Sequence, residues 1–260
     1  MDLQLKGKVV IVTGGAKGIG AAIVRSCAAE GAVPVIVGRD AETGGQLQEE
    51  LRRKDMPCGL ITTELSLAEN CAKAVEETVR EFGAVDGLVN NAGRNDKVGL
   101  ERGSPEEYVA SLQRNLFHYY NMAHFALPHL KRSKGAIVNI SSKTALTGQG
   151  ETSGYASAKG AQLALTREWA AELLPFGIRV NAVIPAEVMT PLYRSWLDTF
   201  PNRDEKLKTI LSKIPLGKRM TTAEEIAAMT VFLLSPQSSH TTGQQIFVDG
   251  GYVHLDRALT

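Results

Sequence analysis

The chain has 260 residues, of which 43% are hydrophobic and 22% charged, and its formal net charge is +1. A chain of this size can bury a sizeable core, and no Pro/Gly/Ser-rich linker, charge block or low-complexity segment divides it, so we expect one domain over residues 1–260. Because Lys and Arg are not clustered, the sequence argues against a nucleic-acid partner or a membrane surface and favours a small-molecule partner.

The sequence predicts a cytoplasmic protein without a metal centre. No run approaches the roughly 20 apolar residues of a membrane span, and residues 1–8 carry charge without the apolar stretch of a secretory signal. The three cysteines are an odd number without C-x-x-C spacing, which argues against a disulfide framework or structural zinc. Three histidines in one predicted helix lack acidic or cysteine partners for a metal; they are His118, His124 and His129.

Short β-branched runs alternate along the chain with longer segments of helical period. The expected strands cover residues 9–13, 35–37, 59–63, 87–90, 136–141, 179–184 and 246–249. The expected helices cover residues 18–30, 42–54, 68–82, 105–131, 153–174 and 222–234. The first six strands are apolar enough to be buried on both faces, as a parallel sheet requires. With right-handed crossovers this order predicts an α/β protein, a single-domain Rossmann fold whose doubly wound, seven-stranded parallel sheet carries helices on both faces.

In such a sheet the ligand crevice lies at the carboxyl ends of the strands, and the polar motifs of this chain follow strand ends. The first strand leads into Thr-Gly-Gly-Ala-Lys-Gly-Ile-Gly at residues 13–20. Glycines at 14, 18 and 20 allow a tight turn, a close approach to a pyrophosphate and close packing of helix on strand. The N–H groups that begin the helix can bind the anion, so this turn predicts a dinucleotide site.

The end of the second strand bears on the choice between NAD and NADP. Gly38 stands where an acidic residue would bind the ribose 2′-hydroxyl of NAD, and Arg39 follows with a guanidinium suited to a 2′-phosphate. Lys17 in the glycine-rich turn adds a second cation. NADP is therefore preferred. NAD stays an alternative, because Arg39 beside Asp40 also fits an ordinary surface charge.

A Tyr and a Lys four residues apart, Tyr155 and Lys159, predict the catalytic centre. They share one helix face, so the ammonium is expected to hold the pKa of the phenol below its usual value of about 10 and to make Tyr155 a proton acceptor. Ser142 ends the preceding apolar run, and Asn90-Asn91-Ala92-Gly93 follows the fourth strand. Alone, the Tyr-x-x-x-Lys spacing also fits a solvated helix face, and the accompanying motifs favour catalysis.

Together these residues resemble the short-chain dehydrogenase/reductase family. The resemblance rests on T-G-x-x-x-G-x-G at 13–20, N-N-A-G at 90–93, Asn115, Ser142, Tyr155-x-x-x-Lys159 and Asp249-Gly250-Gly251. Within the family, residues 139–150, 184–193 and 251–259 resemble those of bacterial L-fucose dehydrogenases.

The resemblance implies a reaction. Tyr155 takes the proton of an anomeric hydroxyl, Ser142 hydrogen-bonds the same oxygen, and C1 of the sugar passes a hydride to the nicotinamide, which leaves a lactone. Lys159 lowers the pKa of Tyr155 and holds the nicotinamide ribose, and Asn115 anchors a water that links Lys159 to solvent. The alternative for Asn115 is that it caps or kinks the long helix around it.

The resemblance also assigns cofactor contacts along the crevice. The residues expected at the cofactor are Gly14, Lys17, Gly18, Ile19, Gly20, Arg39, Glu64, Leu65, Asn91, Ala92, Gly93, Tyr155, Lys159, Pro185, Val188 and Thr190. Of these, Glu64 and Leu65 are placed at the adenine. The family usually has glycine after Pro185, so a left-handed backbone at Ala186 would be strained. The sequences that resemble L-fucose dehydrogenases share Pro-Ala-Glu, which favours a feature of their pocket over a defect.

A sugar needs several fixed hydrogen-bonding groups, and the loops near Ser142 and the nicotinamide end supply them. The residues expected at the substrate are Ser142, Lys143, Gln149, Tyr155, Glu187, Tyr193 and Trp196. Each polar loop residue also fits a solvated position, and Glu187 is the strongest candidate. A small helical lid is expected over about residues 189–215, with one apolar stripe formed by Leu192, Tyr193, Trp196, Leu197 and Phe200.

The predicted activity is NAD(P)-dependent oxidation at C1 of an aldose of the L-fucose, L-galactose or D-arabinose type. One alternative is a 3-oxoacyl-thioester or other carbonyl reductase, which shares every core motif. Another is a non-catalytic NADP-sensing protein, which would not need the four catalytic residues together. Related enzymes pack the 105–131 and 153–174 helices in pairs, so the resemblance implies a homotetramer. Residues 249–251 are expected to form a turn at a subunit contact rather than a cation site.

Overall fold

The computed structural model describes residues 1–256, so the last part of the segment 251–259 lies outside the described residues. Seven strands form one parallel sheet in the order β3-β2-β1-β4-β5-β6-β7. The strands are β1 (Val9–Thr13), β2 (Val33–Gly38), β3 (Gly59–Thr62), β4 (Gly87–Asn90), β5 (Ala136–Ile140), β6 (Arg179–Pro185) and β7 (Gln245–Val248). The predicted doubly wound sheet is confirmed, and its strand order reverses between β1 and β4, where such sheets bind ligands.

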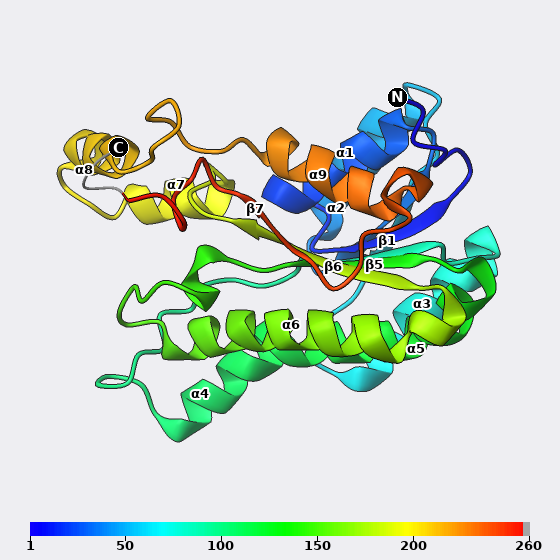
Figure 1. The fold of residues 1–260 in the computed structure, drawn as a ribbon, viewed down its shortest axis with the longest axis horizontal. Helices are drawn as coiled ribbons and strands as arrows, with labels where there is room; N and C mark the ends of the chain where they lie inside the picture. Colours follow the sequence, from blue (N-terminus) through cyan, green and yellow to red (C-terminus); the bar gives the residue numbers. More distant parts are fainter. Residues whose placement is uncertain (257–260) are drawn as a thin grey trace.

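Helices cover both faces of the sheet (Figure 1). On one face lie α1 (Gly18–Ala29), α2 (Ala41–Arg52) and α9 (Ala223–Leu234), and on the other lie α3 (Ala68–Phe82), α5 (His118–Ser133) and α6 (Ser153–Glu172). α4 (Pro105–Leu112) leads into α5, whereas α7 (Pro191–Leu197) and α8 (Arg203–Ser212) lie together at one end of the sheet. Three 3-10 turns complete the described elements: η2 (Lys143–Ala145), η3 (Leu174–Phe176) and η4 (Pro236–Ser238). None of the described helices combines the length and the apolar character needed to cross a membrane.

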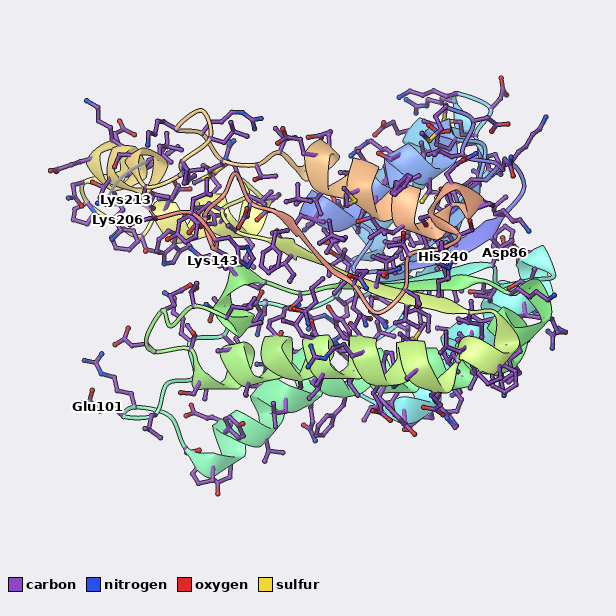
Figure 2. All side chains as sticks on the ribbon, viewed as in Figure 1. Asp86, Glu101, Lys143, Lys206, Lys213 and His240 are labelled. Carbon is purple, nitrogen blue, oxygen red and sulfur yellow. The ribbon has the colours of Figure 1, made fainter. Side chains whose placement is uncertain are left out.

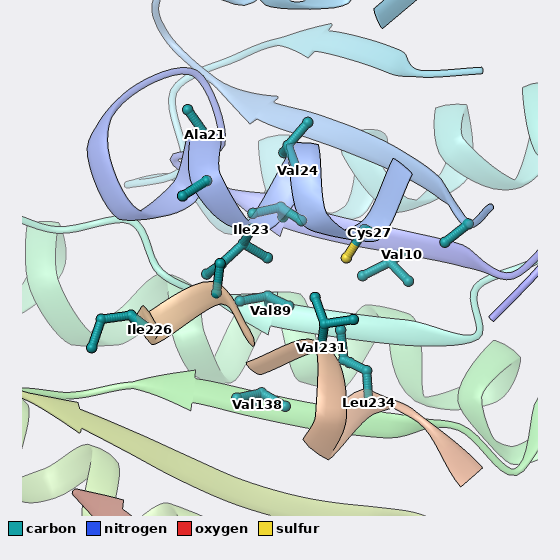
Figure 3. Close-up of a cluster of buried hydrophobic side chains, with 14 of the residues drawn as sticks. Val10, Ala21, Ile23, Val24, Cys27, Val89, Val138, Ile226, Val231 and Leu234 are labelled. Carbon is teal, nitrogen blue, oxygen red and sulfur yellow. The ribbon is translucent and has the colours of Figure 1, made fainter. Parts of the chain in front are cut away.

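Alternate residues of the central strands are buried on opposite faces of the sheet. Val10 and Val12 of β1 belong to the core formed with α1 and α9, and Figure 3 shows the labelled side chains of this core. Val9 and Ile11 belong to the core on the α5 and α6 side. The edge differs, because Thr62 of β3 is exposed. The expectation that the first six strands are buried on both faces is therefore wrong for β3, which has a neighbouring strand on one side only.

The predicted helix over residues 105–131 is divided in the structure. α4 ends at Leu112, a π-helical turn covers Gln113–Phe117, and α5 begins at His118. A π turn shifts the backbone hydrogen bonds by one residue, and such turns are frequent at functional sites. No proline or glycine marks this turn in the sequence, and Pro128 lies inside α5 without ending it.

The two ends of the sheet carry different groups. Lys143, which follows β5, lies at the end where α7 is found, and Asp86, which precedes β4, lies at the opposite end (Figure 2). Among the residues expected to form the apolar stripe of the lid, Leu197 is 1% exposed and Leu192 is 53% exposed.

Candidate active site

The glycine-rich turn after β1 has the backbone that a dinucleotide requires. Gly14 and Gly18 adopt left-handed φ values of 64° and 53°. A Cβ at Gly20 would lie 2.2 Å from the carbonyl oxygen of Gly14, so only glycine fits there. Lys17, the residue before α1, makes no side-chain cap, and the first N–H groups of α1 are therefore available to an anion such as a pyrophosphate.

The Asn-Asn-Ala-Gly segment after β4 is bonded to this turn. The carboxamide of Asn91 donates to the carbonyl oxygens of Thr13, at 2.9 Å, and Gly14, at 3.2 Å. The N–H of Ala92 donates to the Thr13 hydroxyl at 3.1 Å. A Cβ at Gly93 would lie 3.0 Å from Oδ1 of Asn115 and 3.9 Å from Nζ of Lys159. This segment thus joins the predicted cofactor site to the predicted catalytic residues.

The third side of the crevice comes from the residues after β6. Pro185 ends that strand, and Ala186 does not adopt a left-handed backbone, so alanine causes no such strain at this position. Val188 is buried and pairs with Thr221 in a parallel bridge. A Cβ at Gly18 would lie 3.1 Å from Cγ2 of Thr190. Thr190, one of the predicted nicotinamide-side residues, therefore lies against the glycine-rich turn, in which Ile19 is half-buried.

The cations expected at the 2′-phosphate are paired with carboxylates at the surface. Lys17 Nζ lies 2.5 Å from Asp40, and Arg39 lies 3.2 Å from Glu64. The hydrogen bond from Lys17 and the backbone N–H of Thr43 lower the pKa of Asp40 to about 2. Leu65, next to Glu64, is buried. A 2′-phosphate here would meet two cations and two carboxylates.

The four predicted catalytic residues lie together at the carboxyl ends of β4 and β5. Asn115, Ser142 and Lys159 are buried. The phenol of Tyr155 is hydrogen-bonded with the Ser142 hydroxyl. The ammonium of Lys159 lies 5.5 Å from the centre of the Tyr155 ring. The arrangement can hold one oxygen of an alcohol or carbonyl between Ser142 and Tyr155.

The expected lowering of the Tyr155 pKa is wrong for this structure. Burial raises the pKa of Tyr155 to about 12, although the hydrogen bond with Ser142 opposes that rise and the charge of Asp96 adds to it. Burial also lowers the pKa of Lys159 to about 7. The ammonium donates to three other groups, the Tyr119 hydroxyl at 3.2 Å, the Ile140 carbonyl at 2.8 Å and Oε1 of Gln162 at 3.2 Å, and not to the Tyr155 phenol.

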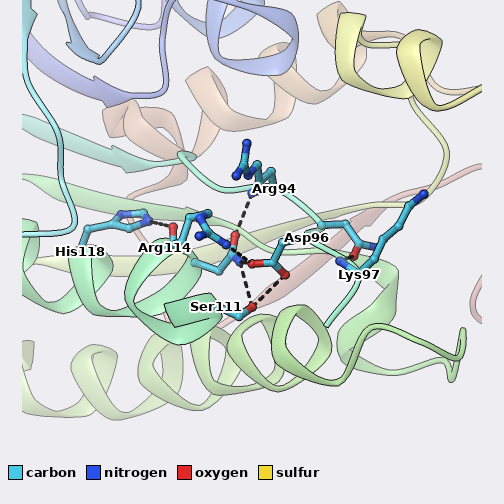
Figure 4. A network of polar contacts seen from close by, with 8 residues as sticks. Arg94, Asp96, Lys97, Ser111, Arg114 and His118 are labelled. Carbon is cyan, nitrogen blue, oxygen red and sulfur yellow. Dashed lines mark hydrogen bonds and ion pairs between the residues drawn. The ribbon is translucent and has the colours of Figure 1, made fainter. Parts of the chain in front are cut away.

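Asp96 organises the surroundings of Asn115, and sequence reasoning missed it. Its carboxylate accepts hydrogen bonds from Arg114 at 2.5 Å, from Ser111 at 2.9 Å and from the Asn115 carboxamide at 3.4 Å (Figure 4). Oδ1 of Asn115 accepts from the N–H of Arg94 at 2.8 Å. Asn115 thus lies within the π turn that interrupts the helix, which agrees with the interpretation that it caps or kinks the helix. It also faces Lys159. The sequence feature that could have identified Asp96 is its position three residues after Gly93.

Lys143 and Glu187 form a buried ion pair on the predicted substrate side, and their side chains are only 11% and 12% exposed. The phenol of Tyr193 is hydrogen-bonded with Glu187, and burial together with that charge raises the pKa of Tyr193 well above its usual value. Trp196 packs edge-on against Tyr193, with ring centres 5.1 Å apart. Gln149 is exposed in the loop before α6, and no hydrogen bond or ion pair within residues 1–256 connects it to this cluster.

Tyr252 belongs to the same cluster and was not predicted. The ammonium of Lys143 lies 4.0 Å from the centre of its ring. Asp249, three residues before Tyr252, is buried and builds a turn, because its carboxylate accepts from the N–H groups of Gly251 at 2.8 Å and Val253 at 2.9 Å. The predicted turn at 249–251 is therefore present. Its position directly before Tyr252 is the sequence feature from which Tyr252 could have been predicted. Across the part of the chain that the structure describes, no group of three His, Cys, Asp or Glu residues could hold a metal.

Comparisons with known proteins agree with this geometry. The sequence model of a family described as enoyl-(acyl carrier protein) reductase matches residues 14–253. L-fucose dehydrogenase of Bos taurus is 36% identical over 252 residues, which are 96% of this chain and 91% of that protein. A 3-oxoacyl-[acyl-carrier-protein] reductase of Thermotoga maritima is 36% identical over 255 residues, which are 96% of this chain and 100% of that protein. The chain belongs to the short-chain dehydrogenase/reductase family.

Solved structures include two dehydrogenases with the same fold. The Cj0485 dehydrogenase has a TM-score of 0.96 and 50% identity, covering 100% of this chain and 99% of its own. The aldohexose dehydrogenase of Thermoplasma acidophilum has a TM-score of 0.88 and 30% identity over 98% of each chain. The predictions of an oxidoreductase of this family and of similarity to L-fucose dehydrogenases are confirmed, and enzymes of this family use NAD(P).

Proposed function

We propose that this protein oxidises a neutral aldose of the L-fucose type at C1. The observation that carries the proposal is the buried pair of Lys143, which directly follows Ser142, and Glu187. Tyr193 and Tyr252 are the other partners of this pair. A carboxylate accepts and an ammonium donates hydrogen bonds, so the pair can bind neighbouring hydroxyls of a sugar. The similarity to L-fucose and aldohexose dehydrogenases supports the same substrate class.

Tyr155 is the proposed base. Its phenol takes the proton of the anomeric hydroxyl, while the Ser142 hydroxyl holds the same oxygen. When bound, NAD(P)⁺ supplies the acceptor for the hydride that leaves C1, and the sugar becomes a lactone. Because burial keeps this phenol protonated, with a pKa of about 12, a nearer positive charge is needed to ionise it. Lys159 is the side chain placed to supply that charge.

The proposed cofactor is NADP, with NAD as a second possibility. The glycine-rich turn, residues 91–93 and residues 185–190 would hold it, because Asn91 bonds to that turn and Thr190 lies against Gly18, and a Cβ at Gly20 would lie 2.2 Å from the Gly14 carbonyl oxygen. Arg39 and Lys17 favour NADP through their positive charge. Their pairing with Glu64 and Asp40 reduces that advantage, so NAD stays the second candidate for the cofactor.

A 3-oxoacyl-thioester reductase is the second candidate, because the matching family description and the Thermotoga maritima relative belong to acyl-carrier chemistry. An acyl chain would bring no polar groups to Lys143 and Glu187, and this cost favours the sugar. A protein that only senses NADP would gain nothing from the hydrogen bond between Ser142 and Tyr155.

The test mixes purified protein with L-fucose and either NADP⁺ or NAD⁺ and follows the absorbance of the reduced nicotinamide. We expect Tyr155→Phe to lower turnover by about 10²–10⁴-fold without loss of NADP binding. Tyr108→Phe is the matched control, since the Tyr108 hydroxyl donates to Ser157 at 3.0 Å and the substitution keeps the apolar ring. Faster turnover of a 3-oxoacyl thioester than of any aldose would select the second candidate, and NADP binding without any turnover would indicate a sensor.

The proposal includes a cytoplasmic homotetramer. The surface of α4 and of the turn and helix that follow it exposes apolar side chains suited to packing against a second copy; they are Tyr108, Val109, Phe117 and Tyr120. Light scattering gives the mass of the assembly and tests this part directly.

A further inference from the structure

The carboxamide of Gln162 joins two parts of the proposed catalytic centre. Gln162 lies on α6, three residues after Lys159, and is 0% exposed. Its Oε1 accepts a hydrogen bond from Nζ of Lys159 at 3.2 Å, and its Nε2 donates to the carbonyl oxygen of Asn115 at 2.8 Å. Both ends of one buried amide are therefore engaged, one by the lysine and the other by the π turn.

The π turn supplies the acceptor for this amide. Asn115 lies in the middle of Gln113–Phe117, where the helical hydrogen bonds change register. A buried backbone carbonyl needs a partner, and Gln162 provides it from the neighbouring helix. The hydrogen bond to the Asn115 carbonyl thus holds the Gln162 side chain in place independently of Lys159.

The ammonium of Lys159 is fully coordinated by protein groups. It has three N–H donors, and they meet the Tyr119 hydroxyl, the Ile140 carbonyl and Gln162 Oε1 at 2.8–3.2 Å. The Tyr119 hydroxyl itself donates to the Ile140 carbonyl at 3.0 Å, so two of the three acceptors hold each other in place. Gln162 is the acceptor that fixes the third direction.

We infer that Gln162 is a positioning residue that determines where the Lys159 ammonium lies and thereby the pH at which Tyr155 ionises. The inference rests on the proposed roles of Lys159 and Tyr155. A carboxamide neither gains nor loses a proton near neutral pH, so Gln162 orients the lysine without titrating itself.

The other titratable groups around Lys159 and Tyr155 are His118, Tyr119 and the ion pair of Asp96 with Arg114. On α5, burial lowers the pKa of His118 to about 4 and raises the pKa of Tyr119 well above its usual value, so both stay neutral near pH 7–10. Asp96, from the loop after β4, is paired with Arg114. The titrating groups that face each other here are therefore Lys159 and Tyr155, both on α6.

The test measures the pH dependence of kcat for alcohol oxidation. Gln162→Leu removes an acceptor from a buried ammonium, which destabilises its charged form and withdraws support from the Tyr155 phenolate. The pH at half-maximal kcat should therefore rise, by about one unit. Gln162→Glu has the same size and keeps an acceptor, but its negative charge offsets that of Lys159, so the midpoint should rise as well.

Thr166→Val is the matched control. Thr166 is buried one turn further along α6 and bonds the Gln162 carbonyl at 2.8 Å and the Asn139 carboxamide at 3.0 Å, without contact to Lys159. This variant should melt at a lower temperature and keep the wild-type midpoint.

An unchanged midpoint in the folded Gln162 variants, or an equal rise in Thr166→Val, would overturn the inference. If the leucine variant does not fold, the glutamate variant decides. The profile is recorded with whichever alcohol the wild type oxidises, so failure to oxidise aldoses would overturn the proposed function and still leave Gln162 under test.

Discussion

Replacing one partner of the buried pair of Lys143 and Glu187 should destabilise the protein more than replacing both. Lys143→Met leaves a carboxylate with the Tyr193 phenol, and Glu187→Met leaves an ammonium with the Tyr252 ring. The remaining charge cannot recover its hydration, because these side chains are only 11% and 12% exposed. The double variant removes both charges and fills the space with flexible apolar side chains.

The expected size of the effect follows from this burial. Breaking a buried ion pair costs about 3–5 kcal/mol, and the small residual exposure places each single variant at about 2–4 kcal/mol. Unfolding entropy near 2.1 cal/mol/K per residue gives roughly 0.5 kcal/mol per kelvin for 260 residues. Each single variant should therefore melt about 4–7 °C lower. The double variant should lose less than about 1 kcal/mol, since apolar replacement of such a pair is often neutral.

The assay combines denaturant titration of the three variants with kcat/KM for L-fucose. All three should lose at least about tenfold in kcat/KM, because hydrogen bonds to charged groups contribute about 1.5–3 kcal/mol each. NADP affinity should stay constant. A double variant that loses the sum of the two single losses would show that the charges are not coupled. A double variant that keeps kcat/KM within about threefold of wild type would show that the pair does not bind the substrate.

Three further predictions concern the cofactor, the backbone and acid stability. Arg39→Ala should raise KM for NADP at least about tenfold and KM for NAD much less, because charge-assisted bonds to the 2′-phosphate are lost. Steady-state kinetics with both cofactors measures this, and equal changes in the two KM values would contradict the prediction. Gly93→Ala should lower stability by about 1–3 kcal/mol in urea, because φ is 149° and its Cβ would lie 3.0 Å from Asn115, and an unchanged midpoint would refute the argument. Burial lowers the pKa of His118 from 6.5 to about 4, so the unfolded chain binds more protons than the folded one between these values. Stability should fall as pH drops through that window, by about 3 kcal/mol at pH 4, and His118→Gln should flatten the curve; equal slopes in both proteins would exclude His118 as the cause.

Much of the fold could be predicted because local signals and tertiary structure agree. The apolar run of β1 followed by glycines at 14, 18 and 20 specifies a strand, a turn and a helix whose geometry only glycine permits. The π turn over Gln113–Phe117 could not be predicted in the same way. Its carbonyl at Asn115 is paired with Gln162, which is 47 residues away, and no local residue pattern reports that contact.

The candidate site was predictable as a set of residues and not as a set of bonds. Residues that follow parallel strands meet at one edge, so Asn115, Ser142, Tyr155 and Lys159 were expected together. The choice of partners for Lys159 depends on Tyr119 and Ile140, which enter from α5 and β5. Likewise Lys143 and Glu187 were each expected at the substrate, whereas their pairing with one another required the structure.

The turn at Asp249 has a consequence for the order in which the protein is made. Strands β4 to β7 join the sheet in the same order in which they leave the ribosome, and each extends the same edge. The glycine-rich turn and residues 90–93 are thus synthesised early, whereas residues 185–190 of the proposed cofactor site follow only at the end of β6. Tyr252 follows the final strand, so the proposed sugar site is the last part of the site to be completed.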